Sequence, residues 1–236
     1  PAVVHLSVAA LGFLALYGFL HRRLGRPAAW LGLGVLASVT SLSTLAGRAY
    51  VDWGVVTFGF MAFWALEEAL AQRERRWLVI SAVLAGMTMG TKYTGLFLAA
   101  GVGLVLAWQV LRAARSPGHR PVTARWRDLL LWGSVAAGTV SPWLVRNLLL
   151  TGNPVYPFLI GGWQWDAWKT AWITRSGSGL IADPWRVLTA PWEVTVLGRE
   201  AGLYDASLGP LLLALLPVAL ICLWPPRFGG GWRNVR

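Results

Sequence analysis

Residues 77–108 decide the fold, and they read WLVISAVLAGMTMGTKYTGLFLAAGVGLVLAW, with Lys92 as the only charged residue. A single helix of this length would span about 48 Å, whereas the hydrocarbon core of a bilayer is about 30 Å thick. One helix would also place the arginines of residues 73–76 and of residues 112–127 on opposite sides of the membrane, although basic connectors tend to share the cytoplasmic side. The sequence therefore predicts two short helices joined by a turn at residues 90–95.

The rest of the chain has the same apolar character. Of its 236 residues, 56% are hydrophobic and only 13% are charged, and the mean hydropathy is +0.54. A soluble domain carries about 25% charged residues. The apolar residues fall into seven blocks, which predict an all-α, polytopic membrane protein with about seven transmembrane helices. The blocks cover about residues 3–20, 28–46, 53–70, 77–91, 94–111, 129–146 and 206–224.

The basic residues predict the orientation of the chain. A net charge of +11 would suit a nucleic-acid partner, but the arginines form short clusters between apolar blocks, so we expect no nucleic acid. Alternate connectors hold fourteen and seven basic residues, and most of the seven lie in one long loop. The positive-inside rule therefore predicts a multi-pass protein of the cytoplasmic membrane with its N-terminus outside. The clusters at Arg22, Arg75, Arg120 and Arg233 are expected in the cytoplasm.

Three parts of the chain follow from this topology. Residues 1–146 form a transmembrane domain of six spans, residues 147–205 an outer segment, and residues 206–236 the last span with a basic cytoplasmic tail. The outer segment is rich in tryptophan, and three of its tryptophans share one helical face, which predicts a helix lying in the headgroup region. These three are Trp165, Trp168 and Trp172. The chain has one cysteine, Cys222, which excludes an internal disulfide.

Asp52 is the first candidate for chemistry, since it precedes an apolar block at the predicted outer face. One interpretation is a helix N-cap that binds backbone N–H groups. The other is a functional carboxylate that takes a proton from an acceptor hydroxyl or binds a divalent cation such as Mg²⁺ or Mn²⁺. The two roles are compatible. The sequence contains no Walker, GxSxG or GxGxxG motif, so it offers no support for nucleotide-driven or serine-hydrolase chemistry.

Three cations are predicted at the outer ends of different helices, where the charge rule favours few of them: Arg48, Lys92 and Arg146. Anchoring to lipid headgroups is one explanation, and a lysine near a helix end commonly extends toward the headgroups. The alternative is that all three converge near Asp52 on one phosphate, which is bound well by a point charge together with bidentate donors. Lys92 favours this alternative, because an ionisable residue in a turn between short membrane helices is a functional candidate.

Four short motifs together resemble bacterial members of the GT-C superfamily, which contains the protein O-mannosyltransferases of glycosyltransferase family 39 and the aminoarabinose transferase of lipid A. The motifs are AYVD at 49–52, GTKYTG at 90–95, PWLVRN at 142–147 and TGNPVYP at 151–157. Their order, their spacing and their predicted side of the membrane agree with that superfamily over about residues 1–160.

The resemblance implies a GT-C fold and a glycosyltransferase that takes a sugar from a polyprenyl-phosphate carrier at the outer face, with inversion at the anomeric carbon. Asp52 matches the second of two acids in such enzymes, which holds a metal or orients substrate, and we expect it to be catalytic. The other acid, which the resemblance implies is the catalytic base in the first outer loop, has no counterpart, so we expect it upstream of Pro1, in a chain that lacks the first helix and first outer loop. The residues expected to bind the donor are Arg48, Tyr50, Lys92, Tyr93, Arg146, Asn153 and Tyr156.

The expected partners are membrane lipid, a polyprenyl-phosphate sugar as donor, and a glycan, lipid or protein acceptor. A transporter or flippase-like carrier of a lipid-linked or anionic substrate is the competing prediction, and a non-catalytic membrane scaffold is the third. Transporters usually bind substrate near the bilayer midplane between paired repeats. In this sequence the candidate residues gather near one surface and no repeat is evident, which favours the transferase.

Overall fold

The structure is a computed structural model that describes residues 2–46, 50–115, 126–158, 165–173, 185–198 and 207–223. Within these ranges the regular elements are helices and no strand is present. The chain divides into two compact units. Unit 1 comprises Pro1–Leu33 and Thr44–Arg175, and unit 2 comprises Gly34–Ser43 and Ser176–Arg236.

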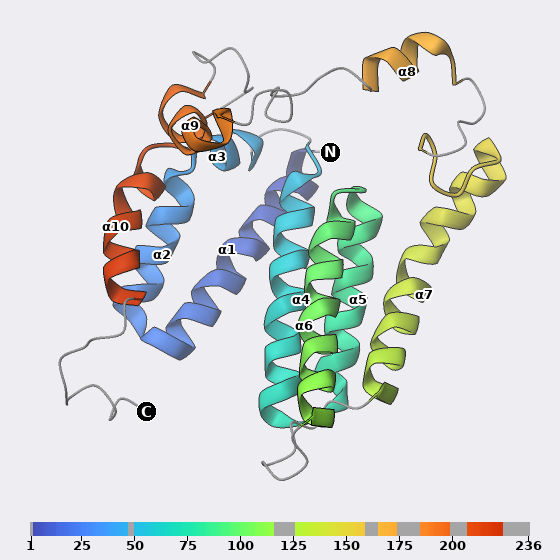
Figure 1. The fold of residues 1–236 in the computed structure, drawn as a ribbon, viewed down its shortest axis with the longest axis horizontal. Coiled ribbons are helices and arrows are strands. Elements are labelled where there is room, and N and C mark those ends of the chain that lie inside the picture. Colours follow the sequence, from blue (N-terminus) through green and yellow to red (C-terminus); the bar gives the residue numbers. More distant parts are fainter. Residues whose placement is uncertain are drawn as a thin grey trace. The chain divides into compact units, whose positions relative to one another are not determined.

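Unit 1 is a helical bundle in which α5 is central. Helix α5 packs against α4, α6 and α7, while α1 packs on the other side of α4. Figure 1 shows α4, α5 and α6 running side by side. The helices of unit 1 are α1 (Ala2–Leu24), α4 (Asp52–Gln72), α5 (Arg75–Thr91), α6 (Gly95–Arg115), α7 (Trp126–Thr151) and the short α8 (Ala167–Ile173).

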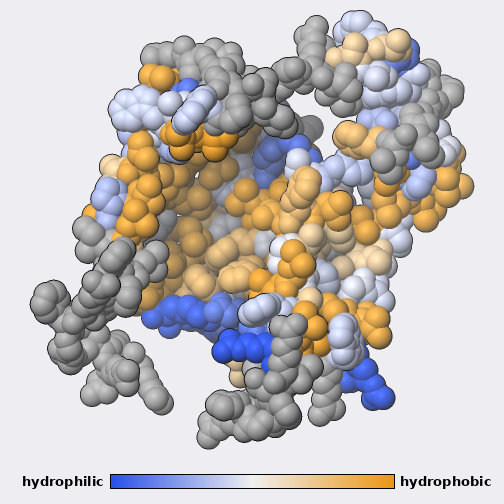
Figure 2. Space-filling model, in the orientation of Figure 1, coloured by the Kyte–Doolittle hydropathy of each residue, from blue (hydrophilic) through white to orange (hydrophobic). Residues whose placement is uncertain are grey.

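Among the described residues, three helices are by themselves long and apolar enough to cross a membrane, namely Val3–Leu24, Asp52–Gln72 and Gly95–Arg112. Helices α2 (Arg26–Ser38) and α3 (Thr40–Ala46) together form a fourth candidate span, bent by 83° at the break between them. Figure 2 shows hydrophobic side chains across the middle of the helices and hydrophilic ones toward their ends. The predicted all-α membrane protein is confirmed, and each of the seven apolar blocks contains a helix.

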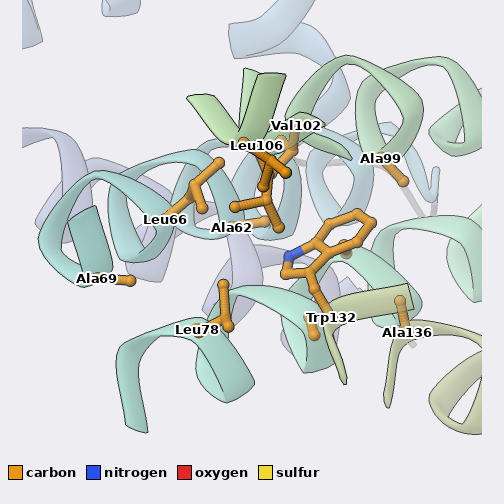
Figure 3. Packing of buried hydrophobic residues seen from close by; sticks show 12 residues of the cluster. Ala62, Leu66, Ala69, Leu78, Ala99, Val102, Leu106, Trp132 and Ala136 are labelled. Carbon is orange, nitrogen blue, oxygen red and sulfur yellow. The ribbon is translucent and has the colours of Figure 1, made fainter. Parts of the chain in front are cut away.

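The core of unit 1 is built around small side chains that let the helices approach closely, and Figure 3 shows Trp132 of α7 lying among them. The Trp132 indole Nε1 donates a hydrogen bond to Ser81 Oγ (3.0 Å), and Ser81 Oγ donates to the carbonyl oxygen of Ala62 (2.8 Å). This relay joins α7, α5 and α4. Because a bilayer offers no water to buried polar groups, such internal partners are what allow a serine and an indole N–H into this core.

The turn predicted within residues 77–108 is confirmed, because α5 ends at Thr91 and α6 begins at Gly95. The block at residues 28–46, predicted as one helix, instead breaks at Val39. Ser38 Oγ donates to the carbonyl of Val35 (2.7 Å), and Ser43 Oγ donates to the carbonyl of Ala37 (2.6 Å). These hydroxyls bind backbone groups that a continuous helix would use otherwise, which bends or ends helices.

The two ends of the bundle differ in charge. At the end where α1 and α4 finish and α5 begins, three ion pairs link neighbouring helices, and we call it the arginine end. The pairs are Arg22–Glu68 (3.7 Å), Arg23–Glu67 (2.7 Å) and Arg75–Asp128 (3.8 Å). The opposite end, where α4 and α6 begin and α5 and α7 finish, is called the Asp52 end. It carries most of the described residues that the sequence singles out.

The predicted outer segment is partly described. Helix α7 continues to Thr151, five residues beyond the predicted boundary, and ends before Gly152, which has a φ of +74°. Trp168 and Trp172 lie on α8, and Trp165 immediately precedes it. The Lys169 backbone N–H donates to Asp166 Oδ1 (2.8 Å) and holds the pKa of that carboxyl below its ordinary value.

Unit 2 joins a segment near residue 40 to the C-terminal part of the chain. The Ser41 backbone N–H donates to the carbonyl of Ser207 (3.2 Å), and Gly209 adopts a φ of +87° beside Ser38. The other elements of unit 2 are α9 (Arg186–Trp192), the π-helix η1 (Glu193–Leu197) and α10 (Leu211–Leu223). Cys222 lies on α10.

Candidate active site

The Asp52 end holds an ion pair between residues forty positions apart in the sequence. The Lys92 ammonium Nζ donates to Asp52 Oδ1 at 2.8 Å. The side chains are 43% exposed for Lys92 and 33% exposed for Asp52. Asp52 belongs to the first turn of α4, and Lys92 follows the last residue of α5. A carboxylate and an ammonium group, both accessible from outside the bundle, therefore meet at one point.

Two glycines explain why these residues meet. A β-carbon on Gly54 of α4 would lie 2.7 Å from Thr91 Cγ2, so the start of α4 lies directly against the end of α5. A β-carbon on Gly95 would lie 2.1 Å from the carbonyl oxygen of Thr88, so the first residue of α6 rests on the backbone of α5. Only glycine permits such close approach. Asp52 stands two residues before Gly54, and Lys92 one residue after Thr91, so the glycine contacts place the pair.

We expect Gly95→Ala to lower the free energy of unfolding by about 2 kcal/mol or more, because the new methyl group meets the backbone of α5 and the helices must move apart. Gly101→Ala on the same helix is the matched control, since a β-carbon there meets nothing within 4 Å. Alanine at that position should leave stability unchanged or raise it by up to about 1 kcal/mol. Thermal unfolding of the two variants in detergent measures the difference, and equal stabilities would contradict the close contact.

Of the two interpretations offered for Asp52, the structure does not support the helix N-cap. The cap position of α4 is occupied by Val51, with φ −77° and ψ −4°, and no side chain provides a capping hydrogen bond there. Asp52 is instead the first helical residue, and its Oδ1 binds Lys92. A negative charge in the first turn also interacts favourably with the helix dipole. The carboxylate is therefore oriented by an ammonium group and not by the backbone of its own helix.

Tyr93, the next residue, connects the α5–α6 turn to the end of α7. Its hydroxyl donates to the carbonyl oxygen of Tyr156 (2.5 Å) and accepts a hydrogen bond from the amide Nδ2 of Asn147 (3.2 Å). The ring of Tyr93 also meets the ring of Phe158 edge to face, with centroids 5.0 Å apart. The turn at residues 152–158, which we call the α7 turn, is thereby fastened beside Lys92.

Asn153 and Tyr156 shape the α7 turn. Asn153 is only 1% exposed, its Nδ2 donates to the carbonyl of Phe158 (2.8 Å), and its Oδ1 accepts from the Val155 backbone N–H (2.9 Å). Because its amide is buried and bonded on both sides, we assign Asn153 to the fold of the turn. Tyr156 offers its carbonyl to Tyr93, and its ring packs edge to face against Trp165 at 5.7 Å. Its ring therefore links the α7 turn to the tryptophan-rich segment.

The other predicted cations are placed differently. Arg146 is exposed near the end of α7, and its guanidinium lies over the ring of Trp143 at 5.3 Å. It immediately precedes Asn147, so α7 brings it to the same end of the bundle as Lys92. Tyr50 is 53% exposed and stands two residues before Asp52. Arg48 lies outside the described residues. The convergence of all three cations on one anion therefore stays a prediction.

The side chains around Asp52 do not by themselves suit a divalent cation. Magnesium and manganese prefer several oxygen ligands in octahedral geometry. Among the described residues no three of His, Cys, Asp and Glu gather at one point. Asp52 supplies one carboxylate, and an ammonium group already lies 2.8 Å from its Oδ1. The described residues around Asp52 therefore do not by themselves supply the oxygen ligands that Mg²⁺ or Mn²⁺ prefers.

Two positioning residues were not assigned a role from the sequence. Asn147 is 5% exposed, and besides Tyr93 it donates to the carbonyl of Pro154 (3.3 Å). The indication in the sequence is an asparagine in the last turns of an apolar helix, where a buried amide needs partners. Gly54 gave a weaker indication, because a single glycine near a helix start is common. Its role depends on Thr91, which no local pattern connects to it.

Comparison with known proteins agrees with the motifs. A family model described as dolichyl-phosphate-mannose-protein mannosyltransferase matches residues 2–145, well over half of the chain. No curated protein and no solved structure matches the chain. The matched region includes α4, α5, α6 and the Asp52–Lys92 pair. The chain therefore belongs to the dolichyl-phosphate-mannose-protein mannosyltransferase family, a GT-C family of membrane glycosyltransferases that use lipid-linked sugar donors.

Proposed function

We propose that the protein transfers a sugar from a polyprenyl-phosphate carrier to an acceptor hydroxyl at the outer face of the membrane, with inversion at the anomeric carbon. The observation that carries this proposal is the Asp52–Lys92 pair, which joins a carboxylate to a cation at one end of the bundle. Family membership supplies the lipid-linked donor. The pair supports the transfer step, because an ammonium group can bind the phosphate and a carboxylate can accept the proton of the acceptor.

Lys92 has the properties of a phosphate-binding group. Its ammonium carries three N–H donors, so it can bind Asp52 and a phosphate oxygen at the same time. At 43% exposure it is accessible to a ligand. As the bond between the anomeric carbon and the phosphate oxygen breaks, the electron pair leaves with the polyprenyl phosphate, and a fixed cation stabilises the developing charge. We assign Arg146, and Arg48 with it, to the same anion.

The resemblance implies a base in the first outer loop, but among the described residues we assign the base for the acceptor to Asp52. The acceptor oxygen forms the new bond to the anomeric carbon on the face opposite the phosphate, and its proton passes to the carboxylate. Lys92 holds Oδ1 of Asp52, and we assign the proton to Oδ2. The lipid phosphate is already a good leaving group, so no covalent nucleophile is needed. No step of this proposal uses a metal ion.

The charge distribution supports an outer location for the site. The arginine end carries the pairs Arg22–Glu68 and Arg23–Glu67, and the cluster at residues 73–76 lies there as well. Basic connectors tend to remain in the cytoplasm. The Asp52 end is opposite, so we place the ion pair, the α7 turn and Arg146 on the outer side of the cytoplasmic membrane.

The proposal is tested with full-length protein reconstituted in sealed vesicles of known orientation and supplied with polyprenyl phosphate labelled in its sugar. We expect label to pass to an acceptor on the Asp52 side, with release of one polyprenyl phosphate per sugar transferred. A carrier would move the lipid across the membrane with its sugar bond intact, and a scaffold would do neither. Transfer confined to the arginine side would contradict the outer location of the site. Recovery of the lipid-linked sugar with its bond intact would contradict the proposal that the protein is a transferase. Vesicles without protein are the control.

A further inference from the structure

The contacts of Tyr93 form a small network that the proposed reaction does not use. The hydroxyl accepts a hydrogen bond from Asn147 of α7 and donates one to the backbone of Tyr156 in the α7 turn. Asn147 in turn donates to the backbone of Pro154. One hydroxyl thereby joins the α5–α6 turn, helix α7 and the α7 turn. Tyr93 and Asn147 lie 54 residues apart in the sequence.

The backbone of the α5–α6 turn makes Lys92 depend on Tyr93. Lys92 has extended backbone angles, φ −160° and ψ 146°, between two helices. Its carbonyl accepts from the Gly95 N–H (2.8 Å), and the Tyr93 carbonyl accepts from the Leu96 N–H (3.0 Å). A three-residue turn with these bonds has little freedom to move one residue without the next. Fixing Tyr93 therefore fixes the direction in which the Lys92 side chain leaves the backbone.

Lys92 itself lacks the burial that would hold it in place. Its side chain is 43% exposed, and the one described ion pair that it makes is with a carboxylate that is also partly exposed. Such pairs are worth only about 0–1 kcal/mol, too little to immobilise a lysine. Tyr93, in contrast, has two hydrogen bonds and the ring of Phe158. The contacts of Tyr93 therefore hold the turn in position, which the exposed ion pair of Lys92 cannot do alone.

We propose that Tyr93 is a positioning residue that fastens the α7 turn to the α5–α6 turn and thereby holds Lys92 in place for the donor phosphate. This inference rests on the proposed function, because it takes Lys92 as the phosphate-binding group. Tyr93 acts through Lys92 and needs no contact with the donor. Its effect should therefore appear in donor binding and vanish when Lys92 is removed.

The test is a double-mutant cycle on full-length protein with polyprenyl-phosphate sugar as the donor. Tyr93→Phe keeps the ring against Phe158 and removes only the hydroxyl. We expect it to raise the donor KM roughly threefold to tenfold, the size of effect of one hydrogen bond. In a Lys92→Met background the same substitution should leave the donor KM unchanged, since two residues that act through one contact are not additive.

Controls separate positioning from general loss of structure. Tyr17→Phe is the matched variant, because the Tyr17 ring stacks on His21, meets Trp30 edge to face and belongs to α1 near the arginine end. It should leave the donor KM unchanged. Asn147→Ala breaks the network from the α7 side and should reproduce the effect of Tyr93→Phe. Thermal unfolding of each variant is recorded, since a raised donor KM at unchanged unfolding temperature is not expected from a purely structural role.

The outcomes distinguish the inference from the proposed function. If Lys92→Met raises the donor KM and Tyr93→Phe does not, the role of Tyr93 is overturned while the phosphate assignment stands. Equal effects of Tyr93→Phe with and without Lys92 would also overturn it, because the tyrosine would then act independently. If Lys92→Met leaves the donor KM unchanged, the phosphate assignment fails and the role of Tyr93 fails with it.

Discussion

Asp52→Asn should lower the rate of sugar transfer by about 10²- to 10⁴-fold, the contribution that a positioned proton acceptor makes to catalysis. Asparagine has the same shape, and its Oδ1 can still accept a hydrogen bond from Lys92. The lost ion pair is partly exposed on both sides, so its removal costs no more than about 1 kcal/mol of stability. We therefore expect inactive protein with a nearly unchanged unfolding temperature. Single-turnover transfer and thermal unfolding in detergent measure the two quantities.

Glu74→Gln provides the matched control for Asp52→Asn. Glu74 is also an exposed carboxylate paired with a cation, Arg76, but it belongs to the arginine end. Neutralising it removes a comparable charge and ion pair without touching the candidate site. Transfer should remain at the level of the unmodified protein. If Asp52→Asn also retained normal turnover, the carboxylate would serve only to hold Lys92, and the base would have to be another residue.

The sequence predicted the bundle well because membrane helices obey strong length and charge rules. The turn around Lys92 followed from the thickness of the bilayer and from the arginines on either side of residues 77–108. The adjacency of Asp52 and Lys92 is compatible with the predicted topology, which placed both at the same surface. Topology could not give their distance. That depends on Gly54 and Gly95, whose importance appears only when the helices are packed together.

The local predictions that failed involve short polar side chains. The break between α2 and α3 arises where Ser38 and Ser43 bond to nearby carbonyls, and hydropathy does not distinguish this from a continuous apolar helix. The place of Asp52 before an apolar block allowed a helix cap as one of two interpretations, yet a partner forty residues away holds its carboxylate. The contacts of Tyr93 with Asn147 and Tyr156 likewise could not be predicted from the sequence, because hydrogen bonds between distant segments leave no local pattern.

The Asp52 end also explains why one lysine is expected to matter so much. A cation that stabilises a leaving phosphate contributes most when it is held in position before the donor arrives. The turn around Lys92 is held by Gly95 on one side and by Tyr93 on the other. The side chain thus begins from a fixed backbone while its ammonium stays accessible. This combination suits a group that binds and releases a lipid phosphate in each cycle.

Lys92→Met should raise the donor KM by about 10- to 100-fold, because it removes a charge-assisted hydrogen bond worth about 1.5–3 kcal/mol while keeping the apolar stem of the side chain. The acceptor KM should change far less, since the acceptor is assigned to Asp52. Initial rates at varied donor concentration and saturating acceptor measure the donor KM. Initial rates at varied acceptor concentration and saturating donor measure the acceptor KM. Lys92→Arg should restore part of the donor affinity, because arginine keeps the charge with a different geometry.

Lys169→Met is the matched control, because Lys169 is the only other lysine of the chain. It is paired with Asp166 at 3.7 Å, and its exposed fraction of 37% is close to the 43% of Lys92. Loss of its charge should leave the donor KM unchanged. Equal increases for the two lysine variants would show a general effect of positive charge on an anionic lipid. An unchanged donor KM for Lys92→Met would reject the phosphate site, and Lys92 would then serve only to orient the carboxylate of Asp52.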